Sequence, residues 1–381
     1  MAAEDNKHQP HLDSVEKPKE KIEPPKPLFH KQTLICMGEY PTKILLKGPL
    51  MDKKDTPMPL FIDKFSEDIA KWSQFYLKPD SILSLNLNID TRFWFQVLPS
   101  IANDDTLIAS LKNRFAGDVS GTLIVSSLWD GVSSGLLPAL VSQFKEWKID
   151  TVAFVVLPSQ MQLPDVHFNA FSSIGLCVSK AFASLLLFDR DHLESYVGVD
   201  RRGSILKGNV VFNYLLQLVL AKKTFVQEFS ELSRNFNVRI YTVLLATGAS
   251  LNLYGSIKNI LDSALFRPFL NFDLSTASVV YVLFRIPVQF KEILQKGLLE
   301  LEVANWFKEK ANLRSLFTTE PIYVEDANDR VDVIMFVGGF ETTKFFKSVE
   351  RRIRMIKSFV VKNGSIKEDD WRIIVRSLGA D

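Results

Sequence analysis

The chain has 381 residues, enough for two domains, and its 46 basic and 44 acidic residues leave no net charge that favours nucleic acid as a partner. Its two cysteines, Cys36 and Cys177, exclude a disulfide framework, and its five histidines show no metal-binding spacing. No apolar run reaches the roughly 18 residues of a membrane-spanning helix, and no apolar core of a secretory signal begins the chain, so we expect a cytoplasmic protein.

The first half of the chain predicts a disordered arm followed by an α/β domain. Residues 1–32 mix charges and prolines with few apolar residues, which is typical of disorder. From Thr33 onward strand and helix patterns alternate, which predicts a doubly wound, nucleotide-binding-type domain with a parallel sheet over 33–204. Its predicted strands are 33–37, 82–88, 123–126 and 151–157, and its predicted helices are 63–75, 104–115, 136–147 and 168–179.

The second half predicts a central helix and a second domain. Residues 205–229 are apolar on nearly every face of a helix, so we expect a buried central helix that runs between two domains and ends in a loop. The segment 230–341 predicts an α+β domain with a mixed sheet, because its strands are rich in β-branched and aromatic residues. We expect strands at 239–246, 278–285 and 331–337, and helices at 256–266 and 290–310.

The tail, 342–381, predicts two amphipathic helices. The first, 342–362, has an apolar stripe, and basic residues lie off that stripe against a single Glu350. Such a face suits an anionic membrane surface, and packing of the stripe on its own domain is the alternative. Residues 363–365 predict a helix stop, and the short helix after them carries Trp371 among its apolar positions.

The clearest local pattern is a strand, a loop of small residues and a helix over 121–143. Pro138 falls in the first turn of that helix, and a helix N-terminus after such a loop can hold a phosphate. The candidate phosphate-binding residues are Gly131, Ser133, Ser134 and Gly135.

The same loop departs from a phosphate cradle in three places. Trp129, Asp130 and Val132 stand where glycine would let backbone amides close on an anion. Both interpretations stay open at this point: a phosphate-binding loop, and a tight turn that binds nothing.

Four further segments carry motifs in order along the chain. Residues 155–158 read Val-Val-Leu-Pro, and residues 188–193 read Phe-Asp-Arg-Asp-His-Leu. Residues 267–277 read Arg-Pro-Phe-Leu-Asn-Phe-Asp-Leu-Ser-Thr-Ala, and residues 331–341 read Val-Asp-Val-Ile-Met-Phe-Val-Gly-Gly-Phe-Glu. With the 121–143 pattern, these motifs resemble the tubulin/FtsZ superfamily and are most similar to archaeal FtsZ-like proteins.

The resemblance implies GTP or GDP as ligand, with Mg²⁺ only where a nucleotide is bound. It adds three candidate site residues: Gly38 after the first strand, Arg190 in place of a guanine-contacting asparagine, and Phe212 in place of a base-stacking phenylalanine. Leu216 replaces a guanine-reading residue, and the segment 88–103 has no glycine where the family has a glycine-rich loop. The resemblance therefore implies a degenerate site with GTP binding weakened or lost.

The resemblance also implies where catalysis would arise. In the family, a loop of the next subunit in a head-to-tail filament completes the nucleotide site. Residues 226–232 are its counterpart here, with Glu228 and Glu231 as candidate catalytic carboxylates. Solvated surface acids are the alternative interpretation.

Three functions are compatible with the sequence. The first is a cytoskeletal or cell-division protein that forms or modulates head-to-tail filaments with itself or a true FtsZ. The second is an active GTPase polymer, and the third is a scaffold that does not polymerise. By resemblance, segment 365–381 would dock on a membrane adaptor and bring the protein to a division site.

Overall fold

The computed structural model describes residues 31–48, 57–64, 79–115, 119–180 and 183–380, together with Ile69 and Leu77. Nearly all of the arm expected at 1–32 lies outside these residues, as does most of the helix expected at 63–75. Asp63, where that helix was expected to begin, ends a strand instead.

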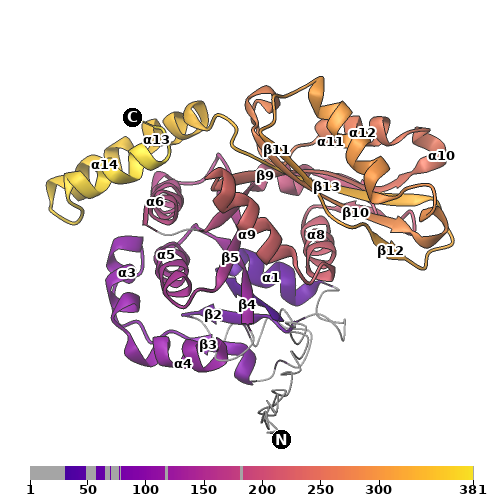
Figure 1. The fold of residues 1–381 in the computed structure, drawn as a ribbon. Helices are drawn as coiled ribbons and strands as arrows, with labels where there is room; N and C mark the ends of the chain where they lie inside the picture. Colours follow the sequence, from indigo (N-terminus) through magenta and orange to yellow (C-terminus); the bar gives the residue numbers. More distant parts are fainter. Residues whose placement is uncertain are drawn as a thin grey trace, which may run out of the picture.

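In the described residues one continuous sheet of 11 strands forms the centre of the molecule (Figure 1). Its order is β11-β10-β13-β9-β6-β5-β4-β1-β2-β3, and β12 pairs with β10. The strands are β1 (Lys31–Met37), β2 (Leu60–Asp63), β3 (Ile82–Ser84), β4 (Val119–Ser127), β5 (Asp150–Leu157), β6 (Ser184–Asp189), β9 (Ile240–Ser250), β10 (Val279–Pro287), β11 (Ser315–Thr318), β12 (Ile322–Val324) and β13 (Arg330–Gly338).

The two halves of the sheet differ in direction. In the first half, the neighbouring strands β3, β2, β1, β4, β5 and β6 all pair in parallel. The strand order reverses between β1 and β4, as in doubly wound folds. In the second half β13 pairs antiparallel with both β9 and β10. The halves join where Leu185 and Leu186 of β6 pair in parallel with β9, and Thr242 Oγ1 then donates to the Leu187 carbonyl, 3.1 Å away.

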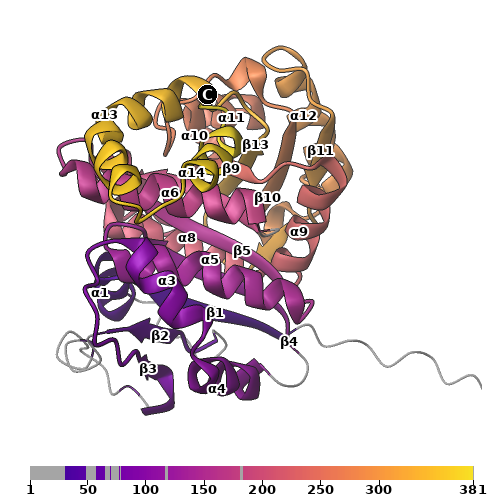
Figure 2. The same ribbon diagram turned by 90° about the vertical axis from the view of Figure 1, so that its left-hand side faces the viewer.

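Helices cover both faces of the sheet (Figure 2), because alternate residues of each central strand point to opposite sides. In β5, Ala153 and Val155 belong to one apolar core, and Phe154 and Val156 to the other. The predicted mixed α/β fold is confirmed. One face carries α3 (Trp94–Ala102), α4 (Asp105–Phe115), α5 (Gly131–Glu146), α6 (Pro164–Lys180), α11 (Ile257–Leu265), α12 (Lys296–Lys308), α13 (Thr343–Lys362) and α14 (Glu368–Ser377), and the other carries α1 (Glu39–Lys47), α8 (Asn209–Ala221) and α9 (Phe225–Phe236).

The segment 205–229, expected to be a central helix that ends in a loop, is divided differently in the structure. Residues 205–207 form β8 (Ile205–Lys207), which pairs with β7 (Val197–Val199), and α8 ends before Lys222. Lys222, Lys223 and Thr224, between α8 and α9, are not helical and form a turn between the two helices. Helices α1 and α3 were not predicted, and the strand expected at 82–88 ends at Ser84.

Helices α13 and α14 form a hairpin that packs on α6. The Trp371 ring stacks on the Phe168 ring with centroids 5.6 Å apart and an interplanar angle of 5°. Ile374 of α14 packs closely against Gly175 of α6. A Cβ atom built on Gly175 would lie within 2.6 Å of Ile374 Cγ2. On α13, Phe346 and Ile353 are buried, and the Phe346 ring makes an edge contact with Phe171 of α6 at 6.0 Å. The apolar stripe of α13 therefore packs on its own chain, as the second of the two alternatives predicted.

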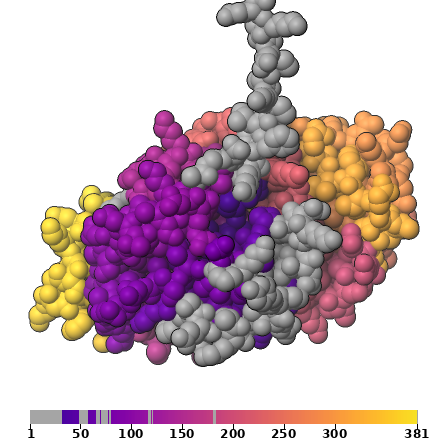
Figure 3. Space-filling view, turned by 90° about the horizontal axis from the view of Figure 1, so that it is seen from below, coloured from indigo at the N-terminus to yellow at the C-terminus, as the bar shows by residue number. Residues whose placement is uncertain are grey.

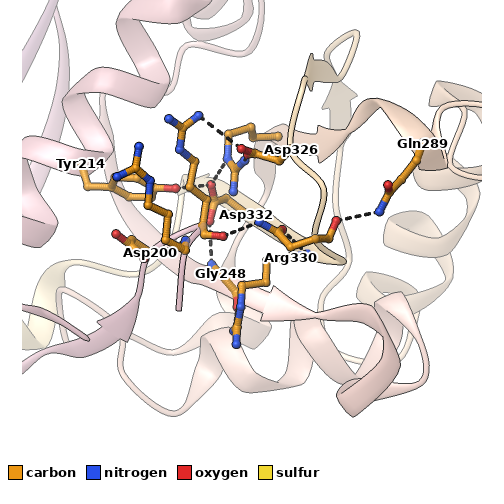
Figure 4. A network of polar contacts seen from close by, with 11 residues as sticks. Asp200, Tyr214, Gly248, Gln289, Asp326, Arg330 and Asp332 are labelled. Carbon is orange, nitrogen blue, oxygen red and sulfur yellow. Dashed lines mark hydrogen bonds and ion pairs between the residues drawn. The ribbon is translucent and has the colours of Figure 1, made fainter. Parts of the chain in front are cut away.

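A buried polar network ties α8 to the second half of the sheet (Figure 4). Asp332, fully buried in β13, pairs with Arg285 of β10. Its carboxylate also accepts hydrogen bonds from the Tyr214 hydroxyl and the Gly248 amide, each at 2.7 Å. Asp326 holds the other side of the Arg285 guanidinium at 2.9 Å.

Both cysteines are free and buried, Cys36 in β1 and Cys177 in α6. Burial raises the pKa of Cys36 to about 12 and raises the pKa of Cys177 well above its ordinary value. In the described part of the chain, no helix is both long and apolar enough to cross a bilayer.

Candidate functional site

The candidate site lies at the carboxyl ends of the parallel strands, where ligands bind in doubly wound sheets. The loops after β1, β4 and β6 meet there. Gly38 follows β1 in a left-handed conformation, with φ of 89°, and a Cβ atom at this position would come within 2.6 Å of Ser127 Oγ. Glycine is therefore required for the chain to turn from β1 into α1 beside the end of β4.

The N-terminus of α5 is capped by a carboxylate of this chain. One Asp130 oxygen accepts from the Ser133 amide at 2.8 Å, and the other lies 2.9 Å from Ser133 Oγ. The Ser133 hydroxyl lies 2.6 Å from the Ser127 carbonyl. Burial raises the pKa of Asp130, and its hydrogen bonds to Ser133 oppose that shift. An anionic group therefore already occupies the end of the helix dipole where a phosphate would bind.

Gly131 faces the segment that leads into helix α3, and Gly135 faces α3 itself. A Cβ atom on Gly131 would lie 2.5 Å from the Thr91 carbonyl oxygen, and one on Gly135 would lie 3.0 Å from the Leu98 amide nitrogen. Ser134, between them, is fully buried. These glycines allow α5 to pack closely on α3 and on the residues just before it, and they do not line an open loop.

Arg190 stacks on two aromatic rings across the strand ends. Its guanidinium carbon lies 5.2 Å from the Tyr40 ring centroid and 4.7 Å from that of Trp129. The two rings lie 4.7 Å from each other. Glu194 holds Arg190 in an ion pair at 2.7 Å, and the Trp129 indole donates to the Val156 carbonyl at 3.1 Å.

The Tyr40 hydroxyl is part of the same cluster. It donates to Asn209 at the start of α8, 3.0 Å away. Burial, with a further contribution from the Glu194 charge, raises the pKa of Tyr40 above its ordinary range. Sequence analysis named Arg190 but missed Tyr40, Glu194 and Asn209. The sequence signal that could have predicted this cluster is the presence of two aromatic residues, Tyr40 and Trp129, in loops where the family has glycine.

The comparisons with known proteins find structures but no close relatives. No protein-family model and no curated protein matches the chain. CetZ from Methanosaeta thermophila strain DSM 6194 is 14% identical with a TM-score of 0.64, over 90% of this chain and 97% of that one. CetZ1 from Haloferax volcanii, solved as a GDP-bound monomer, is 16% identical with a TM-score of 0.64, over 86% of this chain and 100% of that one.

A third structure is CetZ2 from the same organism, solved as a GTPγS-bound protofilament. It is 15% identical with a TM-score of 0.62, over 86% of this chain and 99% of that one. The chain has a tubulin/FtsZ-like fold. In this tubulin/FtsZ-like chain α8 is the helix that lies within the predicted central segment 205–229, and it is shorter than predicted.

Phe212 lies on α8 of the tubulin/FtsZ-like fold, fully buried beneath the sheet. Its ring makes an edge contact with Phe188 at 5.3 Å and a longer one with Phe154 at 6.4 Å. These contacts make it part of the apolar core, so the structure does not bring it together with the cluster around Arg190.

Glu228 and Glu231 lie on α9, and their surroundings differ. Glu228 accepts from Thr224 Oγ1 at 2.6 Å and from the Tyr281 hydroxyl at 2.9 Å, and it pairs with Lys222 at 3.3 Å. Glu231 is exposed. Burial, followed by the Glu228 charge, raises the pKa of Tyr281.

Helix α9 lies at the opposite end of the strands from the candidate site. Val226 packs against Gly121 near the start of β4, and Arg234 pairs with Asp150, the first residue of β5. The loop between α8 and α9 accepts a hydrogen bond from Gln32 at the start of β1. One copy of the chain thus keeps the two predicted acids apart from the predicted phosphate-binding residues.

The residues at α5 do not fit a nucleotide phosphate as they lie here. The Asp130 carboxylate takes the Ser133 amide and would repel an anion, and helix α3 covers the glycines. The described residues also contain no group of three or more His, Cys, Asp or Glu side chains arranged to hold a metal ion.

Proposed function

We propose that this chain is a cytoskeletal or cell-division protein that forms or modulates head-to-tail filaments, with GTP binding weakened or lost. The observation that carries the nucleotide part is the Asp130 carboxylate bound to the N-terminus of α5. The Arg190 stack on Tyr40 and Trp129 supports it, since these side chains occupy the strand ends where a ligand would enter.

The filament part of the proposal rests on the two ends of the molecule. The predicted acids, Glu228 and Glu231, lie toward the amino ends of the strands, and the Asp130 loop lies at the carboxyl ends. Stacking copies in one orientation would bring these ends together, because a contact between unlike surfaces builds an open filament. The CetZ2 neighbour was solved as a protofilament, which favours self-association here.

The first test is calorimetry of GTP and GDP with nucleotide-stripped full-length protein in the presence of Mg²⁺. We expect no binding in the micromolar range, about −8 kcal/mol, because the helix end is already neutralised. Micromolar binding would overturn the nucleotide part. If turnover were then lost in Glu228→Ala with binding intact, an active GTPase polymer would replace this proposal.

The second test is assembly, followed by sedimentation and electron microscopy. We expect filaments of the protein alone, or altered length or number of FtsZ filaments when the two are mixed. Absence of both would leave the non-polymerising scaffold as the function.

The predicted adaptor contact through 365–381 belongs to this proposal with one condition. Trp371 and Ile374 are buried on α6, so an adaptor would have to displace α14. The variant Trp371→Ala loosens α14 from α6. If the adaptor contacts other residues of 365–381, we therefore expect it to bind this variant at least as tightly as it binds the wild type.

A further inference from the structure

The outer face of α13 carries two exposed apolar side chains one helical turn apart. Met355 is 85% exposed and Phe359 is 67% exposed, although the opposite face of the same helix buries Phe346, Ile353 and Val360. Residues four apart lie on one face of a helix, so the two side chains form one apolar pair.

Basic residues surround this apolar pair. Lys344, Lys347, Arg351, Arg354 and Lys362 are all exposed on α13. Arg354 lies 3.9 Å from Glu350, the only acid within the helix. Among the described residues, no carboxylate lies within ion-pair distance of Lys347, Arg351 or Lys362. We call these five basic residues, with Met355 and Phe359, the α13 outer face.

The basic surface continues into a hollow between α13 and α14. This hollow has a volume of about 440 Å³ and is lined on the α14 side by Arg372. On the α13 side it is lined by Lys347, Arg351, Arg354 and Lys357, with Glu350 and Glu368 as the acids among its lining residues. Cations therefore flank the apolar pair and outnumber the acids beside it.

The hairpin is placed where a flat surface can reach it. Figure 2 shows α13 at the outer side of the molecule, and Figure 3 shows the hairpin at the margin, away from the orange second half. Nothing in the described residues lies within 4 Å of a Cβ built at Gly364, in the turn of the hairpin.

We propose that the α13 outer face binds the surface of an anionic lipid bilayer. Met355 and Phe359 enter the interface between headgroups and acyl chains, and the basic residues contact the headgroup phosphates and carboxylates. A helix with a cationic polar face and a few apolar side chains is typical of such binding. An acidic polypeptide would contact the same basic residues, but its binding would not require the two exposed apolar side chains, Met355 and Phe359, among them. This proposal does not depend on nucleotide binding or on filaments.

The test is co-sedimentation of the full-length protein with vesicles. Vesicles of phosphatidylcholine with about 30% phosphatidylserine are compared with vesicles of phosphatidylcholine alone. We expect binding only to the anionic vesicles, and we expect added salt to weaken it because surface charges are screened.

Two pairs of variants separate the contributions. Arg351→Ala with Lys362→Ala should lower the partition coefficient roughly 30-fold, while Lys112→Ala with Lys308→Ala, exposed residues on α4 and α12 with the same charge loss, should leave it unchanged. Met355→Ser with Phe359→Ser should lower it by on the order of ten-fold. Its matched control is Leu253→Ser with Phe266→Ser, at two residues that are each 83% exposed.

Three results with vesicles would overturn the proposal. They are equal binding to neutral vesicles, equal losses in the variants and their controls, and no binding to either vesicle. Binding to polyglutamate as tight as to vesicles, unchanged in Met355→Ser with Phe359→Ser, would also overturn it and identify an acidic polypeptide as the partner. Circular dichroism of each variant checks that α13 stays folded.

Discussion

The carboxylate of Asp130 occupies the N-terminus of α5, where a phosphate would otherwise bind. The Asp130 side chain accepts from both the amide and the hydroxyl of Ser133, so it does for the helix what a bound phosphate would otherwise do. The motif comparison alone presented Asp130 as the loss of a glycine. Its contacts instead give it a stabilising function.

The cap at Asp130 can be measured directly. Asp130→Ala should lower the free energy of unfolding by about 1 kcal/mol, because the Ser133 amide loses its acceptor. Asp130→Asn retains an acceptor oxygen and should cost clearly less. Urea unfolding at pH 7 measures both variants, and equal losses in the two would show that the charge matters and the cap geometry does not.

The carboxylate of Asp332 is the centre of the buried network between α8, β10 and β13. Asp332→Ala should lower the free energy of unfolding by about 3–5 kcal/mol, because it leaves the Arg285 charge buried with fewer partners. Tyr214→Phe removes only one hydrogen bond to the same carboxylate and should cost about 1 kcal/mol. Both follow from urea titrations, and a loss in Asp332→Ala no larger than that in Tyr214→Phe would mean that solvent reaches Arg285.

At the scale of elements, α3 determines what the glycines of α5 do. Helix α3 and the residues just before it cross the first turns of α5 at backbone contact distance, which leaves no room for side chains at Gly135 or Gly131. The same small residues that a phosphate loop uses for close approach to an anion are used here for close approach of two helices.

Gly131→Ala tests this packing. Its methyl group would fall 2.5 Å from the Thr91 carbonyl, so we expect α5 and the segment just before α3 to separate at a cost of about 1–3 kcal/mol in the free energy of unfolding. Gly297→Ala in α12 is the matched control, since nothing lies within 4 Å of its added methyl group. The control should be neutral or stabilising by up to about 1 kcal/mol, and similar effects in both variants would contradict the packing role.

Sequence patterns predicted the elements whose burial is simple. The apolar runs of β4, β5, β10 and β13 identified buried strands, and the stripes of α13 and α14 identified amphipathic helices. Patterns failed at α3, where Pro99 and few polar residues give no clear start or stop signal. They failed again at residues 222–224, where Lys222, Lys223 and Thr224 form a turn between two helices that was not predicted.

The candidate site was predictable in its location but not in its contacts. Motif order placed the loops after β1, β4 and β6 at one end of the sheet. No local pattern states that Tyr40, Trp129 and Arg190, from those three loops, stack on one another. Such contacts depend on tertiary structure.

At the scale of the whole molecule, the sheet does not stop between its parallel and mixed halves. Strand β6 pairs with β9, and Thr242 bridges to Leu187 where the backbone pairing ends. One apolar core also runs along the face covered by α5, α6, α11 and α12. The division into domains at 204, 229 and 341 stays a prediction.

We expect the two halves to unfold together, because separating them would expose this shared core and break the β6–β9 pairing. Hydrogen exchange by mass spectrometry at increasing urea concentrations measures this. Peptides from β5 and β10 should lose protection at the same concentration. Peptides from α10 (Leu251–Tyr254), a helix without buried residues, should lose it earlier and serve as the internal control. Loss of protection in β10 at lower urea than in β5 would indicate two folding units.

The burial of Cys36 and Cys177 makes the chain convenient for site-specific labelling. Alkylating reagents react with exposed thiolates, and both native thiols are enclosed and held protonated at neutral pH. A single Met355→Cys substitution would therefore create one reactive thiol on an otherwise unreactive background. An environment-sensitive dye attached there would shift to shorter emission wavelengths on leaving water, and would report where the outer face of α13 comes to rest.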